Sequence, residues 1–215
     1  MPVLAKICGI NTEEAMRAAI DGGADFVGLV FYPPSPRSVT AAEAANLVAL
    51  VPNGIIRVGL FVDMDDVAMA DILSQVSLDL LQLHGAESPE RLRRIKSETG
   101  LPVMKAIKIA GAHDIALTSG FTEVTDRLLF DAKAPPDLKG ALPGGNALAF
   151  DWTLLAGHNW PCPWMLSGGL DADNVMQAVG VTGASAVDVS SGVEISPGVK
   201  DPARIGDFLS VVKSL

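Results

Sequence analysis

The sequence predicts an α/β fold with a buried parallel sheet, for three reasons. Short apolar runs rich in Val, Ile, Leu and Phe alternate along the chain with alanine-rich segments of helical period. These runs are apolar almost without interruption, as in strands that are covered on both faces. Hydrophobic residues form 49% of the 215 residues and aromatic residues only 5%. This composition predicts one sizeable aliphatic core and excludes a disordered chain.

Eight apolar runs qualify as strands. They are Val3–Cys8, Phe26–Phe31, Arg57–Val62, Leu78–His84, Val103–Ile109, Arg127–Ala132, Trp164–Ser167 and Ala186–Ser190. A helix or turn is expected after each strand, at Thr12–Asp21, Thr40–Val51, Asp65–Ser74, Ser88–Thr99, His113–Thr118, a short turn near Asp151–Leu155, Ala172–Val179 and Pro202–Val212. Thr12 and Ser88 each place a capping hydroxyl before acidic residues, which is typical of a helix start.

The short length of each strand–helix unit favours a closed sheet. Eight units in 215 residues leave about 27 residues for each, close to the minimum for a strand, a helix and two loops. We therefore predict an eight-stranded parallel β/α barrel, the TIM-barrel architecture, with residues 1–215 as a single domain. A doubly wound open sheet stays possible, because the pattern does not distinguish closure from an open edge. Two long loops, 32–39 and 134–150, are expected to be functional.

Charge and cysteine content narrow the functional class. The chain has 16 Lys and Arg against 25 Asp and Glu, a net charge of −9. This balance argues against binding nucleic acid or an anionic membrane, and for a monomer or small oligomer such as a homodimer. Cys8 and Cys162 lie far apart and outside any CxxC motif, so we expect neither a disulfide framework nor a zinc site. The expected location is a reducing cytoplasm.

No targeting or membrane segment is expected. The first ten residues lack the basic, apolar and small-residue regions of a signal peptide. Residues 152–170 are uncharged apart from a histidine and the segment is long, but glycines and prolines interrupt it. We therefore interpret this segment as a loop followed by a buried strand, not as a membrane span.

Polar residues at the ends of the predicted strands are the catalytic candidates, because barrel enzymes carry their active sites at this end. Lys6 and Cys8 end the first strand and share one face. The Lys6 ammonium is expected to lower the pKa of the Cys8 thiol and so favour the reactive thiolate. The alternative is that Cys8 is a small hydrophobic core residue.

Two further strand ends carry ionisable groups. Asp131 follows Leu, Leu and Phe, and burial there favours the protonated carboxyl that a general acid needs. The alternative is a structural carboxylate that pairs with Lys133 or caps a loop. Gln82 and His84 share a face of the fourth strand, where a histidine is as often a hydrogen-bonded scaffold residue as a catalyst. The remaining histidines, at positions 113 and 158, are expected on the surface.

Glycine-containing loops follow the seventh and eighth strands and are candidates for binding an anion. The first contains Ser167, Gly168 and Gly169, and the second contains Ser190, Ser191 and Gly192. Glycine lets backbone N–H groups approach an anion closely, and a following helix N-terminus would add positive potential. Barrels often bind phosphate at these two loops, although tight turns also need glycine. Arg37, in a loop stiffened by prolines, could clamp a carboxylate or simply face solvent. The residues show no spacing typical of metal ligands, so no metal site is expected.

Several short strings, in order from the first strand to the last helix, coincide with those of a known family. They are Lys6-Ile7-Cys8-Gly9-Ile10, Gly28-Leu29-Val30-Phe31 followed by Ser35-Pro36-Arg37, Leu81-Gln82-Leu83-His84-Gly85, Phe130-Asp131, Leu166-Ser167-Gly168-Gly169-Leu170, and Asp188-Val189-Ser190-Ser191-Gly192-Val193-Glu194 with Pro197-Gly198 and Lys200-Asp201. Together they resemble the phosphoribosylanthranilate isomerase family of tryptophan biosynthesis. The family is a β/α barrel that performs an Amadori rearrangement without metal or organic cofactor.

The resemblance implies a role for each candidate. Asp131 would be the general acid that protonates the ribose ring oxygen, and Cys8 the general base that removes the proton from the second sugar carbon. Arg37 would meet the anthranilate carboxylate. The two glycine loops, with Gly145 of the sixth loop, would hold the phosphate. Substrate-binding roles are also expected for Lys6, Gln82, His84 and, as a further member of the site, Asp188.

One loop departs from the family pattern, and two other functions are compatible with the same residues. The sixth loop of the family usually reads glycine-glycine-threonine-glycine, whereas this chain has Gly144-Gly145-Asn146-Ala147. The phosphate contact of this loop is therefore open. The related isomerase of histidine biosynthesis performs the same rearrangement but has an aspartate where Cys8 stands. The other alternative is a phosphosugar-binding protein without catalytic activity.

Overall fold

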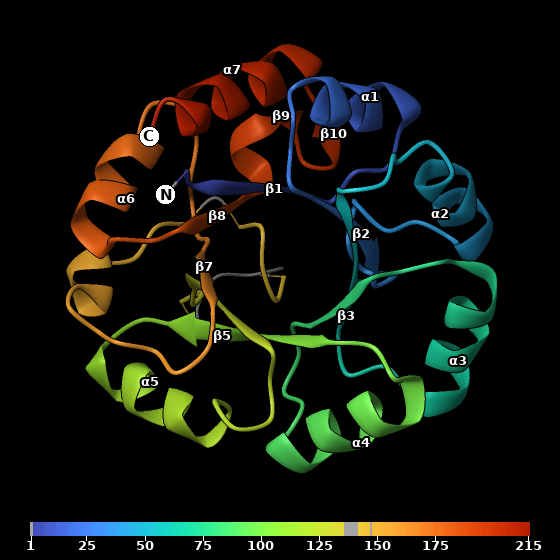
Figure 1. Cartoon of the computed structure of the whole chain (residues 1–215), viewed down its shortest axis with the longest axis horizontal. Coiled ribbons are helices and arrows are strands. Elements are labelled where there is room, and N and C mark those ends of the chain that lie inside the picture. The colour runs from blue at the N-terminus through green and yellow to red at the C-terminus, as the bar shows by residue number, and fades with distance from the viewer. Residues whose placement is uncertain (1, 136–141, 147) are drawn as a thin grey trace.

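The chain forms a closed barrel of parallel strands with helices around its outside (Figure 1). This computed structural model describes residues 2–135, 142–146 and 148–215. The strands follow one another around the barrel in chain order, and the last, Ala186–Val189 (β8), closes it by pairing with the first, Leu4–Cys8 (β1). The predicted eight-stranded β/α barrel is confirmed, and the open-sheet alternative is wrong.

The strands agree with the predicted apolar runs to within two residues at each end. The remaining six are Phe26–Phe31 (β2), Ile56–Phe61 (β3), Leu80–Leu83 (β4), Val103–Ile109 (β5), Arg127–Ala132 (β6) and Trp164–Leu166 (β7). The agreement follows from burial on both faces, which leaves few polar positions inside a strand and makes its limits visible in the sequence.

Seven α-helices of the described residues lie outside the barrel. They are Glu13–Asp21 (α1), Ala41–Val48 (α2), Asp66–Gln75 (α3), Pro89–Thr99 (α4), Ala112–Leu117 (α5), Val175–Thr182 (α6) and Pro202–Lys213 (α7). The predicted caps form: the Thr12 hydroxyl accepts the Ala15 N–H, and the Ser88 hydroxyl accepts the Arg91 N–H. As predicted, the next element described after β6 is a short turn, the 3₁₀ helix Trp152–Leu155 (η2).

Some element limits differ from the prediction, among them the end of α2, at Val48 instead of Val51, and the end of α6, at Thr182 instead of Val179. Helix α6 begins at Val175 instead of Ala172, because the Asp171 side chain accepts the N–H groups of Asp173 and Asn174 and holds them in a turn. After β8, a 3₁₀ turn, Ser191–Val193 (η3), leads into an antiparallel hairpin, Glu194–Ser196 (β9) and Val199–Lys200 (β10). The sequence analysis did not predict this hairpin.

The barrel interior changes from apolar to polar along the strands. Near the strand N-termini it is filled by Phe26, Val58, Leu80, Met104, Ala106, Leu129, Met165 and Ala186. The next inward positions toward the C-terminal ends carry buried polar side chains, among them Lys6, Gln82 and Asp188. A larger apolar core lies between the strands and the helices. No helix in the described part of the chain has the length and apolar character needed to cross a membrane. The polar layer directs attention to the C-terminal end of the barrel.

Candidate active site

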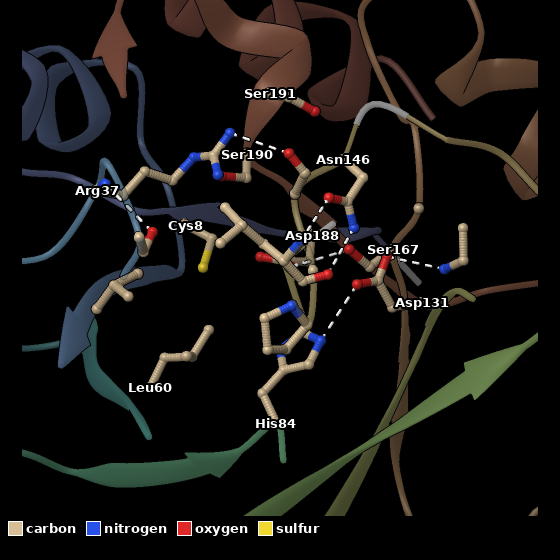
Figure 2. Close-up of a pocket in the computed structure, with 18 of the residues that line it drawn as sticks. Cys8, Arg37, Leu60, His84, Asp131, Asn146, Ser167, Asp188, Ser190 and Ser191 are labelled. Atoms are coloured by element: carbon tan, nitrogen blue, oxygen red, sulfur yellow. Dashed lines mark hydrogen bonds and ion pairs between the residues drawn. The ribbon is translucent and has the colours of Figure 1, made fainter. Parts of the chain in front are cut away.

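A cavity opens at the C-terminal ends of the strands, where catalytic groups were expected. Its lining includes Cys8, Arg37, His84, Asp131, Asp188 and Ser190. Figure 2 shows Cys8 and Arg37 on one side of this cavity and Asp131 on the other, with His84 between them at the lower edge. Residues separated by more than 120 positions in the sequence therefore meet at one site, because each ends a different strand of the same barrel.

Cys8 is buried at the cavity wall, and its environment contradicts one prediction. Burial raises the pKa of the Cys8 thiol, and the nearby Lys6 ammonium opposes this shift without overcoming it. The expected lowering is therefore wrong. The physical reason is that Asp188 also lies close to the thiol and its negative charge raises the pKa further.

Lys6 forms an ion pair with Asp188, so its charge is shared between this carboxylate and the thiol. Lys6 Nζ lies 2.8 Å from Asp188 Oδ1, and both side chains are buried. The Ser167 hydroxyl donates to the other oxygen of Asp188 over 3.1 Å. Burial alone would lower the pKa of Lys6, but attraction to Asp188 and Cys8 outweighs it and raises the value. At Gly28, a Cβ atom would lie 3.1 Å from Lys6 Nζ and 3.2 Å from Cys8 Sγ, so the missing side chain makes room for this cluster.

Asp131 is held at the end of β6 by two hydrogen bonds. Its Oδ1 accepts the N–H of Ala132 at 2.9 Å, and its Oδ2 lies 3.2 Å from His84 Nε2. The alternative pairing with Lys133 does not occur, because Lys133 binds Asp114 at 2.9 Å. A Cβ atom on Gly144 would lie 2.7 Å from Asp131 Oδ2, so the sixth loop passes directly over the carboxyl group.

Arg37 lines the cavity but already has a carboxylate partner, which the sequence analysis missed. Its Nε and Nη2 each lie 2.8 Å from an oxygen of Glu194, and Nη2 also donates to the Gly145 carbonyl. Lys200 Nζ contacts the same carboxylate at 2.7 Å and donates to the Ser190 carbonyl. The cluster Arg37–Glu194–Lys200 is buried, so Arg37 is not a solvent-facing loop residue. The resemblance strings contained Glu194 and Lys200, which was the one available signal.

The charged groups of this cluster shift one another's pKa values. Burial alone would raise the pKa of Glu194, but hydrogen bonds from Arg37 and the charge of Lys200 hold it below its ordinary value. Burial lowers the pKa of Lys200, and attraction to Glu194 only partly offsets this effect. Two cations therefore share one carboxylate, which leaves the site with excess positive charge on the Ser190 side of the cavity.

The two glycine loops meet at the rim. Gly168 and Gly169 have φ of +89° and +66°, and a Cβ atom on Gly169 would lie 2.8 Å from the Leu148 backbone. Both glycines line the cavity, together with Ser190 and Ser191, whereas Gly192 does not. A Cβ atom on Gly192 would overlap the Leu170 carbonyl at 2.0 Å. The lack of a side chain at Gly192 therefore lets the seventh and eighth loops come into contact.

The helix N-termini do not follow these loops as closely as expected. Helix α6 begins six residues after Gly169, and α7 begins only at Pro202, after the hairpin β9–β10. The short turn η3, at Ser191–Val193, follows the eighth strand directly. The backbone N–H groups of the loops, more than the helix ends, are therefore the candidates for binding an anion here.

The other predicted site residues fall into two groups. Ser167 and Gly145 line the cavity, the latter against the Arg37 guanidinium. Lys6 and Gln82 are buried beneath the cavity and do not line it, so the structure does not bring them to a substrate. Residues 136–141 and 147 of the sixth loop lie outside the described residues.

The remaining histidines and acidic groups give no metal site. The histidines at positions 113 and 158 are exposed, as predicted. Within residues 2–135, 142–146 and 148–215, no three His, Cys, Asp or Glu side chains are grouped so that they could hold a metal ion. The cavity brings together a thiol, a carboxyl and a histidine, groups that can transfer protons, next to the two glycine loops.

Comparison with known proteins gives one consistent family. A family model described as "N-(5'phosphoribosyl)anthranilate (PRA) isomerase" matches residues 5–211. The N-(5'-phosphoribosyl)anthranilate isomerase of Rhodospirillum centenum is 56% identical over the full length of both chains. The enzyme of the same name from Paramagnetospirillum magneticum is 55% identical over 99% of this chain and 98% of its own.

Solved structures agree with this result. The phosphoribosyl anthranilate isomerase of Thermotoga maritima superposes with a TM-score of 0.88 at 36% identity, covering 99% of this chain and 100% of its own. A phosphoribosyl anthranilate isomerase in complex with reduced 1-(o-carboxyphenylamino)-1-deoxyribulose 5-phosphate gives a TM-score of 0.83 at 34% identity, with the same coverage.

Proposed function

The chain belongs to the N-(5'-phosphoribosyl)anthranilate isomerase family, and from this premise we propose how its cavity performs the reaction. The enzyme converts N-(5'-phosphoribosyl)anthranilate to 1-(o-carboxyphenylamino)-1-deoxyribulose 5-phosphate in tryptophan biosynthesis. The rearrangement needs one group that gives a proton and another that takes one. The observation that supports the proposal is that Cys8 and Asp131 line opposite sides of the same cavity (Figure 2).

Asp131 acts as the general acid. It donates its proton to the ribose ring oxygen, the bond from this oxygen to the first sugar carbon breaks, and the anthranilate nitrogen forms a Schiff base with that carbon. The carboxylate that remains is stabilised by the N–H of Ala132 and lies within hydrogen-bonding distance of His84. Two contacts that favour the charged product of the first step thus support this role.

Cys8 acts as the general base. Its thiolate removes the proton from the second sugar carbon, which gives an enolamine that tautomerises to the ketone. Because burial raises the pKa of the thiol, the thiolate is a minor species at neutral pH. Once formed, it is a stronger base than an ordinary thiolate, and Lys6 beside it compensates its charge.

The anionic groups of the substrate are bound at the rim. Gly168, Gly169 and Ser190 line the cavity, and Lys200 donates to the Ser190 carbonyl. We assign the phosphate to these two loops, together with Ser191. Gly192 does not line the cavity, and it packs against Leu170 of the seventh loop. Arg37 keeps its Nη1 for the anthranilate carboxylate while Glu194 holds its other two nitrogens. Binding energy from these remote groups orients the sugar between the acid and the base.

Gly145 has a different part in this proposal from the one the resemblance implied. Its carbonyl accepts a hydrogen bond from Arg37, so it helps to fix the guanidinium, and its N–H stays available to the phosphate. Asn146, where the family usually has threonine, accepts the Leu142 N–H and donates to the Leu142 carbonyl. The asparagine closes the loop on itself, so we assign it no substrate contact.

Cellular setting and assembly complete the proposal. A reducing cytoplasm suits a catalytic thiol that must stay unoxidised, and we propose that the chain works there as a single catalytic domain. A relative from Thermotoga maritima is a dimeric enzyme of which monomers have also been crystallised. The present barrel contains every proposed catalytic group in one chain, so a monomer or a homodimer can be active.

An activity assay with two substrates tests the proposed function. The purified protein should consume N-(5'-phosphoribosyl)anthranilate, measured as the loss of its fluorescence, and should be far slower on the aminoaldose substrate of the histidine-pathway isomerase. Faster turnover of the histidine-pathway substrate would contradict the proposal. Binding of the product analogue without any turnover would instead indicate a silent phosphosugar-binding protein.

A further inference from the structure

Gln82 is a buried polar residue for which the proposed mechanism has no use. It lies on β4 two residues before His84, so both side chains point into the barrel. It is fully buried and does not line the cavity. Its Nε2 lies 2.9 Å from His84 Nδ1, and its Oε1 has no hydrogen-bond partner among the described residues.

An amide in this position lowers the stability of the fold, so its presence points to a function. Burying a polar group without a partner costs free energy, and an apolar side chain of similar size would avoid that cost. The side chain makes a single hydrogen bond within the described part of the chain, and that bond goes to His84. Any role of Gln82 is therefore exerted through the His84 ring.

The orientation of the amide determines which nitrogen of His84 carries the proton. The Gln82 Nε2 group is a donor, so His84 Nδ1 must accept, and the proton of the neutral ring is on Nε2. His84 Nε2 lies 3.2 Å from Asp131 Oδ2. The ring then donates to this oxygen, and the chain of hydrogen bonds runs from Gln82 through His84 to Asp131 (Figure 2 shows its second link).

The opposite tautomer would remove the proton that the reaction needs. If His84 carried its proton on Nδ1, Nε2 would be an acceptor. It would then accept the hydrogen bond of the Asp131 carboxyl proton, which would point at the ring and not at the substrate. With the proton on Nε2, His84 cannot accept. The Asp131 proton stays free for the ring oxygen, and the resulting carboxylate gains a donor.

We propose that Gln82 is a positioning residue that holds His84 as the Nε2–H tautomer and so keeps the proton of Asp131 directed at the substrate. The inference rests on the proposed role of Asp131 as general acid. It replaces the expectation that Gln82 binds substrate, since Gln82 acts on the reaction only through His84.

The substitution Gln82→Met tests the proposal, because it keeps the length of the side chain and removes the donor. The matched control is Gln177→Met, at an exposed position of α6. The first measurement is a long-range ¹H–¹⁵N spectrum of protein labelled on histidine. The chain has only three histidines, and loss of signals in His113→Gln and His158→Gln variants assigns the remaining ring to His84.

The spectrum has a definite expected result. In the wild-type protein and in Gln177→Met, His84 should carry its proton on Nε2. In Gln82→Met, the ring should move to the Nδ1–H tautomer or to a mixture of both. A wild-type ring protonated on Nδ1, or unchanged ring nitrogen shifts in Gln82→Met, would overturn the inference whatever the activity is.

Kinetics and stability provide the second measurement. In Gln82→Met, kcat should fall about tenfold or more, while KM changes less than about threefold, and the melting temperature should not fall. A changed tautomer with wild-type kcat would also overturn the positioning role. Failure of the proposed function is recognised separately: Asp131→Asn would then retain turnover, whereas the wild-type tautomer would still be Nε2–H.

Discussion

The reactivity of Cys8 is decided by burial more than by the neighbouring lysine. Lys6 ends the same strand face, and its charge alone would favour the thiolate. The sequence could not reveal that Asp188, 182 positions away, takes up this charge at 2.8 Å. The combination of buried thiol, ammonium and carboxylate is close to neutral overall, so desolvation of the thiolate dominates.

Alkylation of Cys8 should therefore have a high apparent pKa. In a Cys162→Ser variant, Cys8 is the one remaining cysteine. Its rate of alkylation by iodoacetamide should keep increasing with pH at pH values above about 8.5, the ordinary pKa of a thiol. The sign follows from the raised pKa: the thiol stays protonated at pH values where a free thiol has ionised. A midpoint below 8.5 would show that Lys6 and not burial controls the group.

The candidate residues at strand ends could be found from the sequence, but their contacts could not. Cys8, His84 and Asp131 each end an apolar run, and the barrel topology places all such ends at one rim. Lys6 and Gln82 precede the strand ends by two residues, which puts them one layer deeper. The sequence also left Arg37 without a partner, because Glu194 is 157 positions away and lies in a hairpin that apolar periodicity does not reveal.

At the scale of elements, the hairpin β9–β10 connects the eighth loop to the second. Glu194, on β9, contacts Arg37 of the second loop and Lys200 of β10. The Asn11 side chain donates to the Gly198 carbonyl, which attaches the first loop to the same hairpin. Three loops of the rim are thus held relative to one another by a short element whose contacts to them are polar.

Removing the central carboxylate should loosen this arrangement. Glu194→Gln leaves Lys200 without its buried counter-ion, and loss of one partner of a buried pair costs about 3 kcal/mol of unfolding free energy. Urea unfolding measures this loss. KM should rise as well, because Arg37 is no longer held. Glu13→Gln, which removes an exposed pair with Arg17, is the control and should leave both quantities unchanged. Equal effects of the two substitutions would contradict the assignment.

The predicted strands were more accurate than the predicted connections. Burial on both faces makes strand limits visible as apolar runs, whereas helix starts depend on side-chain turns such as that of Asp171. The hairpin escaped prediction because Glu194–Lys200 contains two charged residues, a proline and a glycine within seven positions. Such a string is typical of a loop, and only its tertiary contacts make it a defined element.

At the scale of the whole molecule, buried carboxylates make the fold sensitive to acid. Glu194 and Glu87 have lowered pKa values, because the former is held by Arg37 and Lys200 and the latter by Lys105, each against the opposing effect of burial. A carboxylate with a lowered folded pKa stabilises the fold above its unfolded pKa. That stability is lost as pH falls through the folded value.

The unfolding free energy should therefore be constant near neutral pH and decline below about pH 4.5, the region where unfolded glutamates bind protons. Urea unfolding between pH 7 and pH 3 measures this decline. In Glu87→Gln the decline should be shallower, because one of the responsible groups no longer titrates, although the variant is less stable at neutral pH. An identical slope in the variant would remove Glu87 from this account.

The arrangement of the barrel as a whole supports one reaction scheme. Strands β1 and β6 place the thiol and the carboxyl on opposite sides of the cavity, while β7 and β8 between them carry the loops to which we assign the phosphate. A sugar phosphate held by those loops would extend across the cavity with its ring between the two groups. The proposed mechanism depends on this placement and not on any single bond.

The most direct measurement compares turnover and product binding in Cys8→Ser and Asp131→Asn, with Cys162→Ser and Asp207→Asn as matched controls. Each of the first two substitutions should lower kcat about 100-fold or more, as expected when an acid or base is lost. Affinity for reduced 1-(o-carboxyphenylamino)-1-deoxyribulose 5-phosphate should stay within about threefold of wild type, because neither substitution removes an anion-binding loop. Wild-type turnover in either variant, with the controls unaffected, would contradict the assignment of that residue as acid or base.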